Sequence, residues 1–396
     1  MRKIRFLNLV HPASFFTLLY FFYLGLIIPL SYFFNIGNVI ENTSNLTLFI
    51  VIIFILFFLL GAFLLAPNIF HYKPKIFSSS LKIDVNINKT YLIVFFFLFA
   101  FIIIHLYYFY RIGFVPAFSA DVATVRVSAK KGYGSFLLIA NGMAYASILL
   151  MVIIHNYVSK SLKLLNYCLL FIFVLFIYFE GFRGPAAYLF LLFSLGLYFQ
   201  GESFMKKRKI SMKIILLSFS FVVFLSVLDV IRSGLMFNLS SLNQIFWTMT
   251  VNLYNLNDVV KYFNHNDYLY GQSFVSDLMV AIPGFHSEFM GVKMVKLLGL
   301  SFLGEGMTIT APGEAYLNFG LCGVIIYAIL LGCIADIVFQ SLISNRLSSF
   351  VLLVFFSFCF SKIAVAGIMP TIIFTVLPTF VFLYPALIYI RNVKLQ

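Results

Sequence analysis

Long apolar runs separated by short polar connections fill most of the chain. Ten such runs occur, at residues 14–34, 46–65, 91–110, 136–154, 164–179, 185–199, 214–231, 319–339, 350–366 and 371–390. An α-helix needs about 20 apolar residues to cross ~30 Å of hydrocarbon, and most of the runs approach that length. Helices also satisfy their own backbone hydrogen bonds inside lipid. The pattern therefore predicts an all-α polytopic integral membrane protein with about ten transmembrane helices.

One long connection, residues 232–318, separates the seventh run from the eighth. Its apolar stretches are too short to span a membrane. We therefore expect a large external loop on the periplasmic side, within a single membrane domain of residues 1–396. The stretch IFWTMTVNLYNLNDVV at 245–260 predicts an amphipathic helix at the membrane surface, with Trp247 as its anchor. Pro283 and Gly284 predict a turn further along the loop.

The composition agrees with a lipid environment. Hydrophobic residues make up 62% of the chain and charged residues only 10%, whereas soluble domains average about 25% charged residues. The four cysteines lie in or beside apolar runs without a metal-binding spacing. They are interpreted as small packing residues, and neither a metal site nor a cofactor is predicted. The basic start MRKIRF lacks a small-residue cleavage site, so we expect the first run to be retained as a span.

The net charge of +14 is distributed unevenly along the chain. Lysine and arginine gather in alternate short connections, for instance in KKRK at 206–209. These connections are predicted to face the cytoplasm, because basic residues are retained on that side of a membrane. Both termini then lie in the cytoplasm as well. Since membrane topology accounts for the basic excess, we predict no nucleic-acid partner.

Four arginines lie on the predicted outer side of the membrane, although basic residues are expected to be rare there. Each lies just after, or a short way beyond, a predicted helix end; they are Arg111, Arg126, Arg183 and Arg232. Arginine suits phosphate because its planar fork is always charged and binds bidentately. We predict Arg126, Arg183 and Arg232 as pyrophosphate ligands, and His286 as a further ligand for phosphate or sugar. Snorkelling at helix ends stays open as an alternative, as does an ion pair between Asp229 and Arg232.

Two carboxylates are candidates for a general base. Glu314 lies in PGEAYLNFG at the start of the eighth run and is the first choice, and Glu288 is the second. Sugar transfer from a pyrophosphate carrier needs cations that stabilise the leaving charge and a base that deprotonates the acceptor hydroxyl. The alternative is that Glu314 is a first-turn carboxylate favoured by the helix dipole. His105 is interpreted as a hydrogen-bonded packing residue, and Lys362 has no assigned role.

Three stretches of the chain carry a family resemblance. They are GQSFVSDLMVAIPGF at 271–285, GEGMTITAPGEAYLNFGLCGV at 304–324, and the arginine set with its FRGP and DVIRSG contexts. With these stretches, many spans and one large external loop, the chain resembles the O-antigen polymerase family, the Wzy-type oligosaccharide repeat-unit polymerases. It departs from the expected pattern after Pro283, where Gly-Phe-His stands in place of a basic residue directly after the proline.

The resemblance implies a metal-independent glycosyltransferase of the bacterial inner membrane. It would move the growing glycan from its undecaprenyl pyrophosphate carrier to the next lipid-linked repeat unit at the outer face, in lipopolysaccharide or related polysaccharide biosynthesis. Arg126, Arg183 and Arg232 would hold the carrier phosphates, and Glu314 or a neighbour would activate the acceptor. The implied partners are undecaprenyl-pyrophosphate-linked oligosaccharides, the lipid bilayer and a chain-length regulator protein.

Two other functions stay open. An O-antigen ligase-like glycan transferase would use the same chemistry and differ only in its acceptor. A polysaccharide transporter or flippase belongs to a different class, in which ionisable residues gather near the bilayer midplane. The predicted outer-edge position of most charges disfavours that class.

Overall fold

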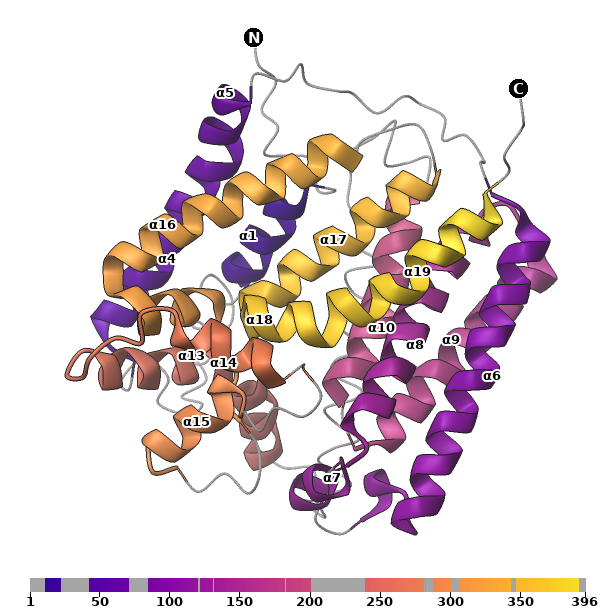
Figure 1. Cartoon of the computed structure of the whole chain (residues 1–396), viewed down its shortest axis with the longest axis horizontal. Helices are drawn as coiled ribbons and strands as arrows, with labels where there is room; N and C mark the ends of the chain where they lie inside the picture. Colours follow the sequence, from indigo (N-terminus) through magenta and orange to yellow (C-terminus); the bar gives the residue numbers. More distant parts are fainter. Residues whose placement is uncertain are drawn as a thin grey trace. The chain divides into compact units, whose positions relative to one another are not determined.

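The computed structural model describes residues 11–22, 43–70, 85–119, 122–130, 132–181, 183–200, 239–280, 282, 288–300, 306–342 and 347–391. Within these ranges the regular secondary structure is helical, apart from one isolated bridge between Val85 and Arg391 (Figure 1). The all-α fold predicted from the apolar runs is therefore confirmed for the described part of the chain.

Seven helical segments within the described ranges are long and apolar enough to cross a membrane. They are Asn45–Ile69 (α4, η3 and α5), α6 (Ile87–Ile112), α8 (Gly134–His155), α9 (Lys160–Phe179), α16 (Ala311–Leu342), Ser349–Ala366 in α17 (Leu347–Ala366), and Ile368–Ile390 (α18, η5 and α19). Each corresponds to one of the predicted runs, which confirms a polytopic membrane protein.

The other three predicted runs have different outcomes. The run at 185–199 forms α10 (Arg183–Gln200), whose apolar part Gly184–Leu197 is shorter than a full span. The run at 14–34 is described only where α1 (Pro12–Phe22) begins it, and the run at 214–231 lies outside the described residues. The total of ten spans, and the external position of 232–318, therefore stay predictions.

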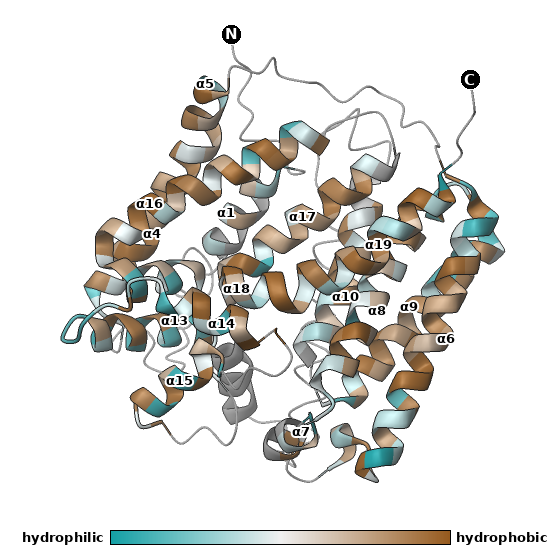
Figure 2. Ribbon diagram, in the orientation of Figure 1, coloured by the Kyte–Doolittle hydropathy of each residue, from teal (hydrophilic) through white to brown (hydrophobic). Residues whose placement is uncertain are grey.

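The surface of α6 shows how these helices meet lipid. One stripe of α6 is buried and includes Val94, Phe101 and Tyr108. Another stripe, at spacings of three and four residues, exposes large apolar side chains: Leu92, Phe96, Phe99, Ile103 and Leu106. A helix that is apolar on its packed face and on its exposed face is typical of a membrane span. The predominantly apolar colouring of α6 in Figure 2 shows the same property.

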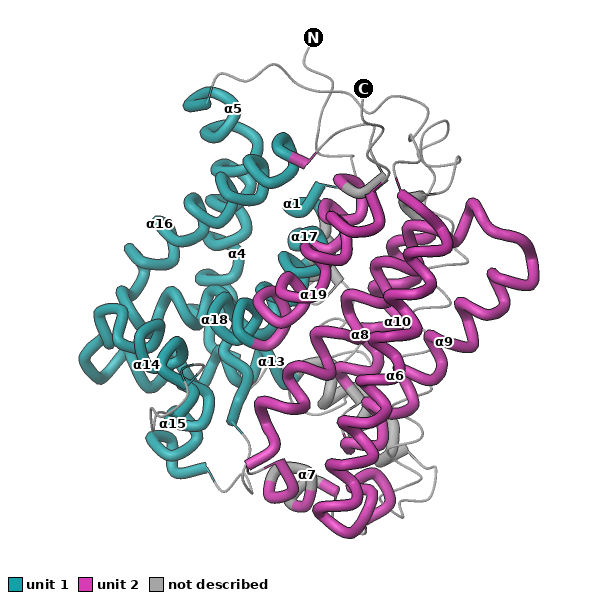
Figure 3. The backbone as a smooth tube through the Cα atoms, turned by 45° about the vertical axis from the view of Figure 1, so that its right-hand side comes forward, with its two compact units in different colours: residues 1–74, 237–341, 356–373 teal, residues 75–236, 342–355, 374–396 magenta. Residues whose placement is uncertain are grey.

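The chain divides into two compact units, drawn in separate colours in Figure 3. Unit 1 comprises residues 1–74, 237–341 and 356–373, and unit 2 comprises residues 75–236, 342–355 and 374–396.

Unit 2 is built around α8. The residues of α8 from Ala144 to His155 are all buried, and α6, α9, α10 and α19 (Leu377–Ile390) pack against this helix. Gly142 allows a close approach of α19, because a Cβ there would lie 2.6 Å from the carbonyl oxygen of Pro378. The short α7 (Val122–Lys130) and the turn η4 (Pro116–Phe118) follow α6 in the chain.

Unit 1 contains α1, α4 and α16 together with three helices of the predicted loop: α13 (Leu239–Phe263), α14 (Gln272–Val280) and α15 (Met290–Leu297). In its core the rings of Phe16 and Phe58 stack with centroids 4.2 Å apart. The helix predicted at 245–260 is confirmed as part of α13. The membrane anchoring by Trp247, whose side chain lies outside the described residues, stays a prediction, as does the turn at Pro283 and Gly284.

Candidate functional site

Glu314 lies in the first turn of α16 and is buried, with 4% of its surface exposed. Its Oε2 accepts hydrogen bonds from the Tyr327 hydroxyl at 2.8 Å and from the N–H of Ile368 at 2.6 Å. Its Oε1 accepts a longer bond from the N–H of Met369 at 3.4 Å. Ile368 and Met369 begin the helical segment Ile368–Ile390, so Glu314 satisfies backbone N–H groups at the start of a second helix.

Gly367 leaves room for this contact. Its φ of 84° lies in the left-handed region, which side chains with a Cβ rarely adopt. A Cβ at this position would also lie 2.7 Å from the carbonyl oxygen of Ile309 and 3.1 Å from Oε2 of Glu314. The chain reversal at Gly367 therefore brings the N–H groups that follow it directly onto the carboxylate.

A break at Gly320 sets off the short helical segment that carries Glu314. The 32 residues of α16 would measure about 48 Å as one straight helix, more than the ~30 Å of a hydrocarbon core. Gly320 adopts φ 63° and ψ −153° and divides the helix into residues 311–319 and 321–342. The carbonyls of Leu317 and Asn318, just before the break, accept the N–H groups of Leu269 and Tyr270 at 2.9 and 3.0 Å.

Asn318 completes the attachment of this segment to the loop. Its amide donates to Ser273 Oγ at 2.6 Å and to the carbonyl oxygen of Glu314 at 2.7 Å. Its Oδ1 accepts the N–H of Gly271 at 3.0 Å. The side chain is fully buried, so these bonds satisfy a polar group that would otherwise be costly to bury. Residues 269–273 and the segment 311–319 are thereby fixed to each other.

Gly320→Ala is expected to destabilise the protein far more than Gly299→Ala. Both glycines have a positive φ, 63° and 64°, so a side chain strains the backbone at either position. The ψ of −153° at Gly320 adds to the strain there, because that combination of angles is essentially confined to glycine. A Cβ at Gly320 would lie 2.8 Å from the ring of Tyr268, whereas a Cβ at Gly299 would have no neighbour within 4 Å. Thermal unfolding of the two variants in detergent checks this. Equal losses would mean that neither the Tyr268 contact nor the backbone conformation at Gly320 disfavours a side chain there.

Glu288, the second candidate base, has a different environment. It is exposed, and both of its carboxylate oxygens contact Lys296 Nζ, at 2.5 and 2.6 Å. The neighbouring Asp277 on α14 is buried and accepts the N–H of Met290 at 2.6 Å. Burial raises the pKa of Asp277 above its usual value, although the bond from Met290 opposes that rise. Sequence reasoning did not single out Asp277, because its burial depends on the fold.

The predicted phosphate ligands are only partly described. Arg126 lies within α7, and Arg183 is the first residue of α10, but their side chains are outside the described residues. Arg232 and His286 lie entirely outside them. The segments carrying Arg126 and Arg183 do meet, because Lys130 Nζ of α7 forms an ion pair with Glu180 Oε2 at 2.7 Å.

Glu180 belongs to a buried charge cluster that sequence reasoning missed. Besides Lys130 it contacts His105, whose Nε2 lies 3.0 Å from Glu180 Oε1 and whose Nδ1 lies 2.8 Å from the Phe101 carbonyl oxygen. Burial would raise the pKa of Glu180, but Lys130 and His105 hold it below its usual value. His105 is hydrogen-bonded, as predicted. Its partner is 75 residues away, which no local pattern reveals.

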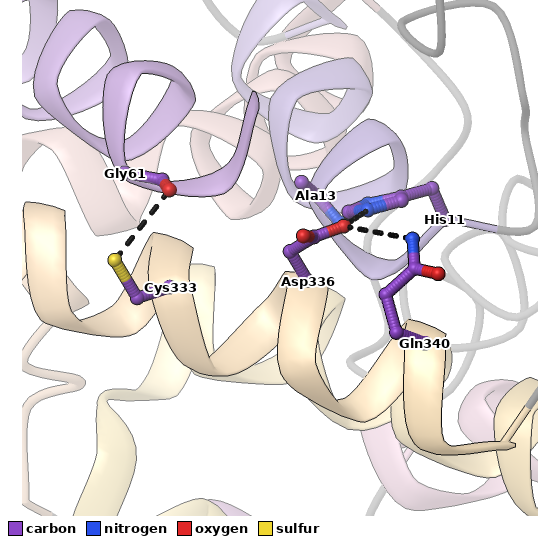
Figure 4. A network of polar contacts seen from close by, with 6 residues as sticks. All are labelled: His11, Ala13, Gly61, Cys333, Asp336 and Gln340. Atoms are coloured by element: carbon purple, nitrogen blue, oxygen red, sulfur yellow. Dashed lines mark hydrogen bonds and ion pairs between the residues drawn. The ribbon is translucent and has the colours of Figure 1, made fainter. Parts of the chain in front are cut away.

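A second buried pair joins α1 to α16 in unit 1 (Figure 4). His11 Nε2 lies 3.0 Å from Asp336 Oδ1, and both residues are fully buried. The N–H of Ala13 donates to His11 Nδ1 at 3.1 Å. Nδ1 is therefore an acceptor, and the ring proton lies on Nε2, where it is donated to Asp336. The Gln340 amide adds a longer bond of 3.4 Å to the same carboxylate oxygen.

Comparison with known proteins decides the family. A model of the family described as "Putative O-antigen polymerase" matches residues 9–368. The chain belongs to this family. No curated protein and no solved structure matches it. The family resemblance read from the sequence is thus confirmed, and the matched O-antigen polymerase region contains every predicted site residue.

That this O-antigen polymerase family member uses neither a metal ion nor a cofactor stays a prediction. Within the described residues, His, Cys, Asp and Glu form no group of three or more that would hold a metal ion. The family assignment fits a multi-pass membrane protein that acts on lipid-linked oligosaccharides. The geometry adds two features that the family description does not contain: the buried, bonded Glu314 in unit 1, and the charge cluster around Glu180 in unit 2.

Proposed function

We propose that the protein polymerises a surface polysaccharide. It transfers the growing glycan from undecaprenyl pyrophosphate to the next lipid-linked repeat unit at the outer face of the bacterial inner membrane. The acceptor hydroxyl attacks the anomeric carbon of the growing chain, and the bond from that carbon to the pyrophosphate oxygen breaks. The hydroxyl proton passes to a carboxylate, and the undecaprenyl pyrophosphate leaves as an anion.

The fixed carboxylate of Glu314 is the observation that carries the proposal. Ile368 and Tyr327 hold its Oε2 by short bonds, while Oε1 has only the 3.4 Å bond from Met369. Oε1 is therefore the oxygen with capacity to accept a hydrogen bond from an acceptor hydroxyl. A carboxylate whose orientation is already set loses little freedom when it takes up that proton. Glu314 is the general base of the proposed mechanism.

Glu288 is a weaker candidate for this role. Its carboxylate is exposed and paired with Lys296. Both of its oxygens contact Lys296 Nζ, so an acceptor hydroxyl would have to displace that ammonium group. Exposure also leaves water as a competing acceptor, whereas Glu314 is shielded from solvent. We keep Glu288 as the base to be tested if Glu314 fails.

Arg126, Arg183 and Arg232, with His286, bind the carrier pyrophosphate in this proposal. A guanidinium gives two parallel bonds to a phosphate and stays charged throughout the reaction. The charge that develops on the leaving pyrophosphate is therefore stabilised without a general acid. The large loop at 232–318 faces the periplasm, both termini face the cytoplasm, and a chain-length regulator acts as a separate partner.

The glycan profile of cells that lack this gene tests the proposal. Loss of the long ladder with a single repeat unit still attached is the result expected for a polymerase. Loss of all attached glycan, with long polymer accumulating on the carrier at the outer face, would instead identify a ligase. Single units trapped on the cytoplasmic side would identify a flippase and overturn the proposed transfer reaction.

A further inference from the structure

The cluster of His105, Lys130 and Glu180 in unit 2 has no role in the mechanism described so far. It brings together three parts of that unit: the middle of α6, the end of α7 and the turn after α9. His105 and Glu180 are buried, and Lys130 is 28% exposed. Three phenylalanine rings surround His105, with ring centroids 4.2 to 6.0 Å from its own: Phe101, Phe109 and Phe176. The charges therefore interact in a largely apolar surrounding, where electrostatic forces are strong.

The hydrogen bonds fix the charge of the cluster. A carbonyl oxygen only accepts, so His105 Nδ1 must carry the proton that it donates to Phe101. One more proton lies between His105 Nε2 and Glu180 Oε1, whichever atom holds it. Adding the carboxylate and the Lys130 ammonium gives one net positive charge for the whole cluster.

The cluster lies at the two segments that carry predicted phosphate ligands. Arg126 precedes Lys130 by one turn of α7, about 6 Å along the helix axis. Arg183 follows Glu180 by three residues and begins α10. The Lys130–Glu180 ion pair therefore links the two backbone segments that carry these arginines. A buried ion pair is weak evidence of stabilisation, since apolar residues of similar volume often do as well. We therefore interpret the Lys130–Glu180 ion pair as fixing the positions of the two segments rather than as a source of stability.

We propose that Glu180 is a positioning residue for an anion site. His105 and Lys130 hold its carboxylate in place through the contacts described above. The ion pair holds α7 and the turn before α10 at the spacing that a pyrophosphate group requires. This inference rests on the proposed function, because the ligand is the polyprenyl pyrophosphate headgroup of that mechanism.

Binding of radiolabelled farnesyl pyrophosphate to the purified full chain in detergent tests the inference. Glu180→Gln and Lys130→Met are expected to raise the Kd at least tenfold while the number of sites per folded protein stays constant. Lys130→Arg keeps the charge and should recover most of the affinity. Lys160→Met is the matched control, because Lys160 is exposed and starts α9, about 28 Å along that helix from Phe179. Its Kd should equal that of the wild type.

The outcomes separate a positioning role from a merely structural one. Fewer sites with an unchanged Kd would show that the cluster only supports folding, and would overturn the inference. An unchanged Kd in both variants would overturn it as well, as would wild-type protein that binds farnesol as tightly as farnesyl pyrophosphate. If Glu180→Gln does not fold, Lys130→Met decides, because that side chain is partly exposed.

The same measurements distinguish failure of the inference from failure of the proposed function. A lost glycan ladder in the deletion strain, together with normal binding by both variants, would overturn only the positioning role. Weakened binding in the variants together with a flippase phenotype would overturn the polymerase proposal and leave the anion site in place.

Discussion

Glu314→Gln is expected to lower the rate of polymerisation by about 10²–10⁴-fold, the usual contribution of a general base. The amide keeps the shape of the side chain, and its oxygen still accepts bonds from Tyr327 and Ile368 at the Oε2 position, so only the longer bond from Met369 is lost. The variant should therefore insert and fold. What it loses is the ability to take a proton from the acceptor hydroxyl. Short glycan chains in a complemented deletion strain, at normal protein level in the membrane, are the expected readout.

Two further variants make the Glu314 experiment decisive. Asp267→Asn is the matched control, because it makes the same acid-to-amide change at an exposed loop position of unit 1. Its ladder should equal that of the wild type. Tyr327→Phe removes one donor to the carboxylate but leaves the backbone donors, so its effect should be much smaller than that of Glu314→Gln. A full ladder from Glu314→Gln would place the base elsewhere, and Glu288→Gln would then be the variant to measure.

The spans were predictable from the sequence because bilayer thickness imposes a length on every crossing helix. The seven segments found among the described residues coincide with apolar runs that composition alone identifies. The run at 185–199 shows the limit of that argument. Its apolar part is shorter than a full span, so hydropathy alone does not decide whether α10 crosses the membrane.

The environment of Glu314 was not predictable in the same way. Its position at the start of a helix followed from the PGEAYLNFG pattern, but its partners come from Gly367 onward, more than 50 residues later. The break at Gly320 was hidden as well, because a single glycine between apolar residues fits a continuous helix. Only the contacts with Tyr268, Leu269 and Tyr270 show why the chain bends there. The cluster around Glu180 likewise depends on pairings between distant segments.

Arg183→Lys is expected to weaken binding of the carrier pyrophosphate about 10- to 100-fold, and to leave little long glycan. Lysine keeps the charge but presents a point charge in place of the planar fork, so one of two parallel bonds to phosphate is lost. A bond to a charged group contributes about 1.5–3 kcal/mol, which corresponds to that range of affinity. Because Arg183 begins α10, the substitution should not disturb the interior of the helix.

Arg391→Lys is the matched control for this experiment. It makes the same change at the exposed end of α19, which the predicted topology places in the cytoplasm. The wild type and both variants are compared by farnesyl pyrophosphate binding and by the glycan ladder of the complemented deletion strain. If Arg183 is a phosphate ligand, Arg183→Lys should bind farnesyl pyrophosphate more weakly and give a shortened glycan ladder. Arg391→Lys should match the wild type in both measurements. If Arg183→Lys binds normally and gives a full chain-length distribution, Arg183 is a snorkelling residue at a helix end, and the phosphate site must rely on Arg126 and Arg232.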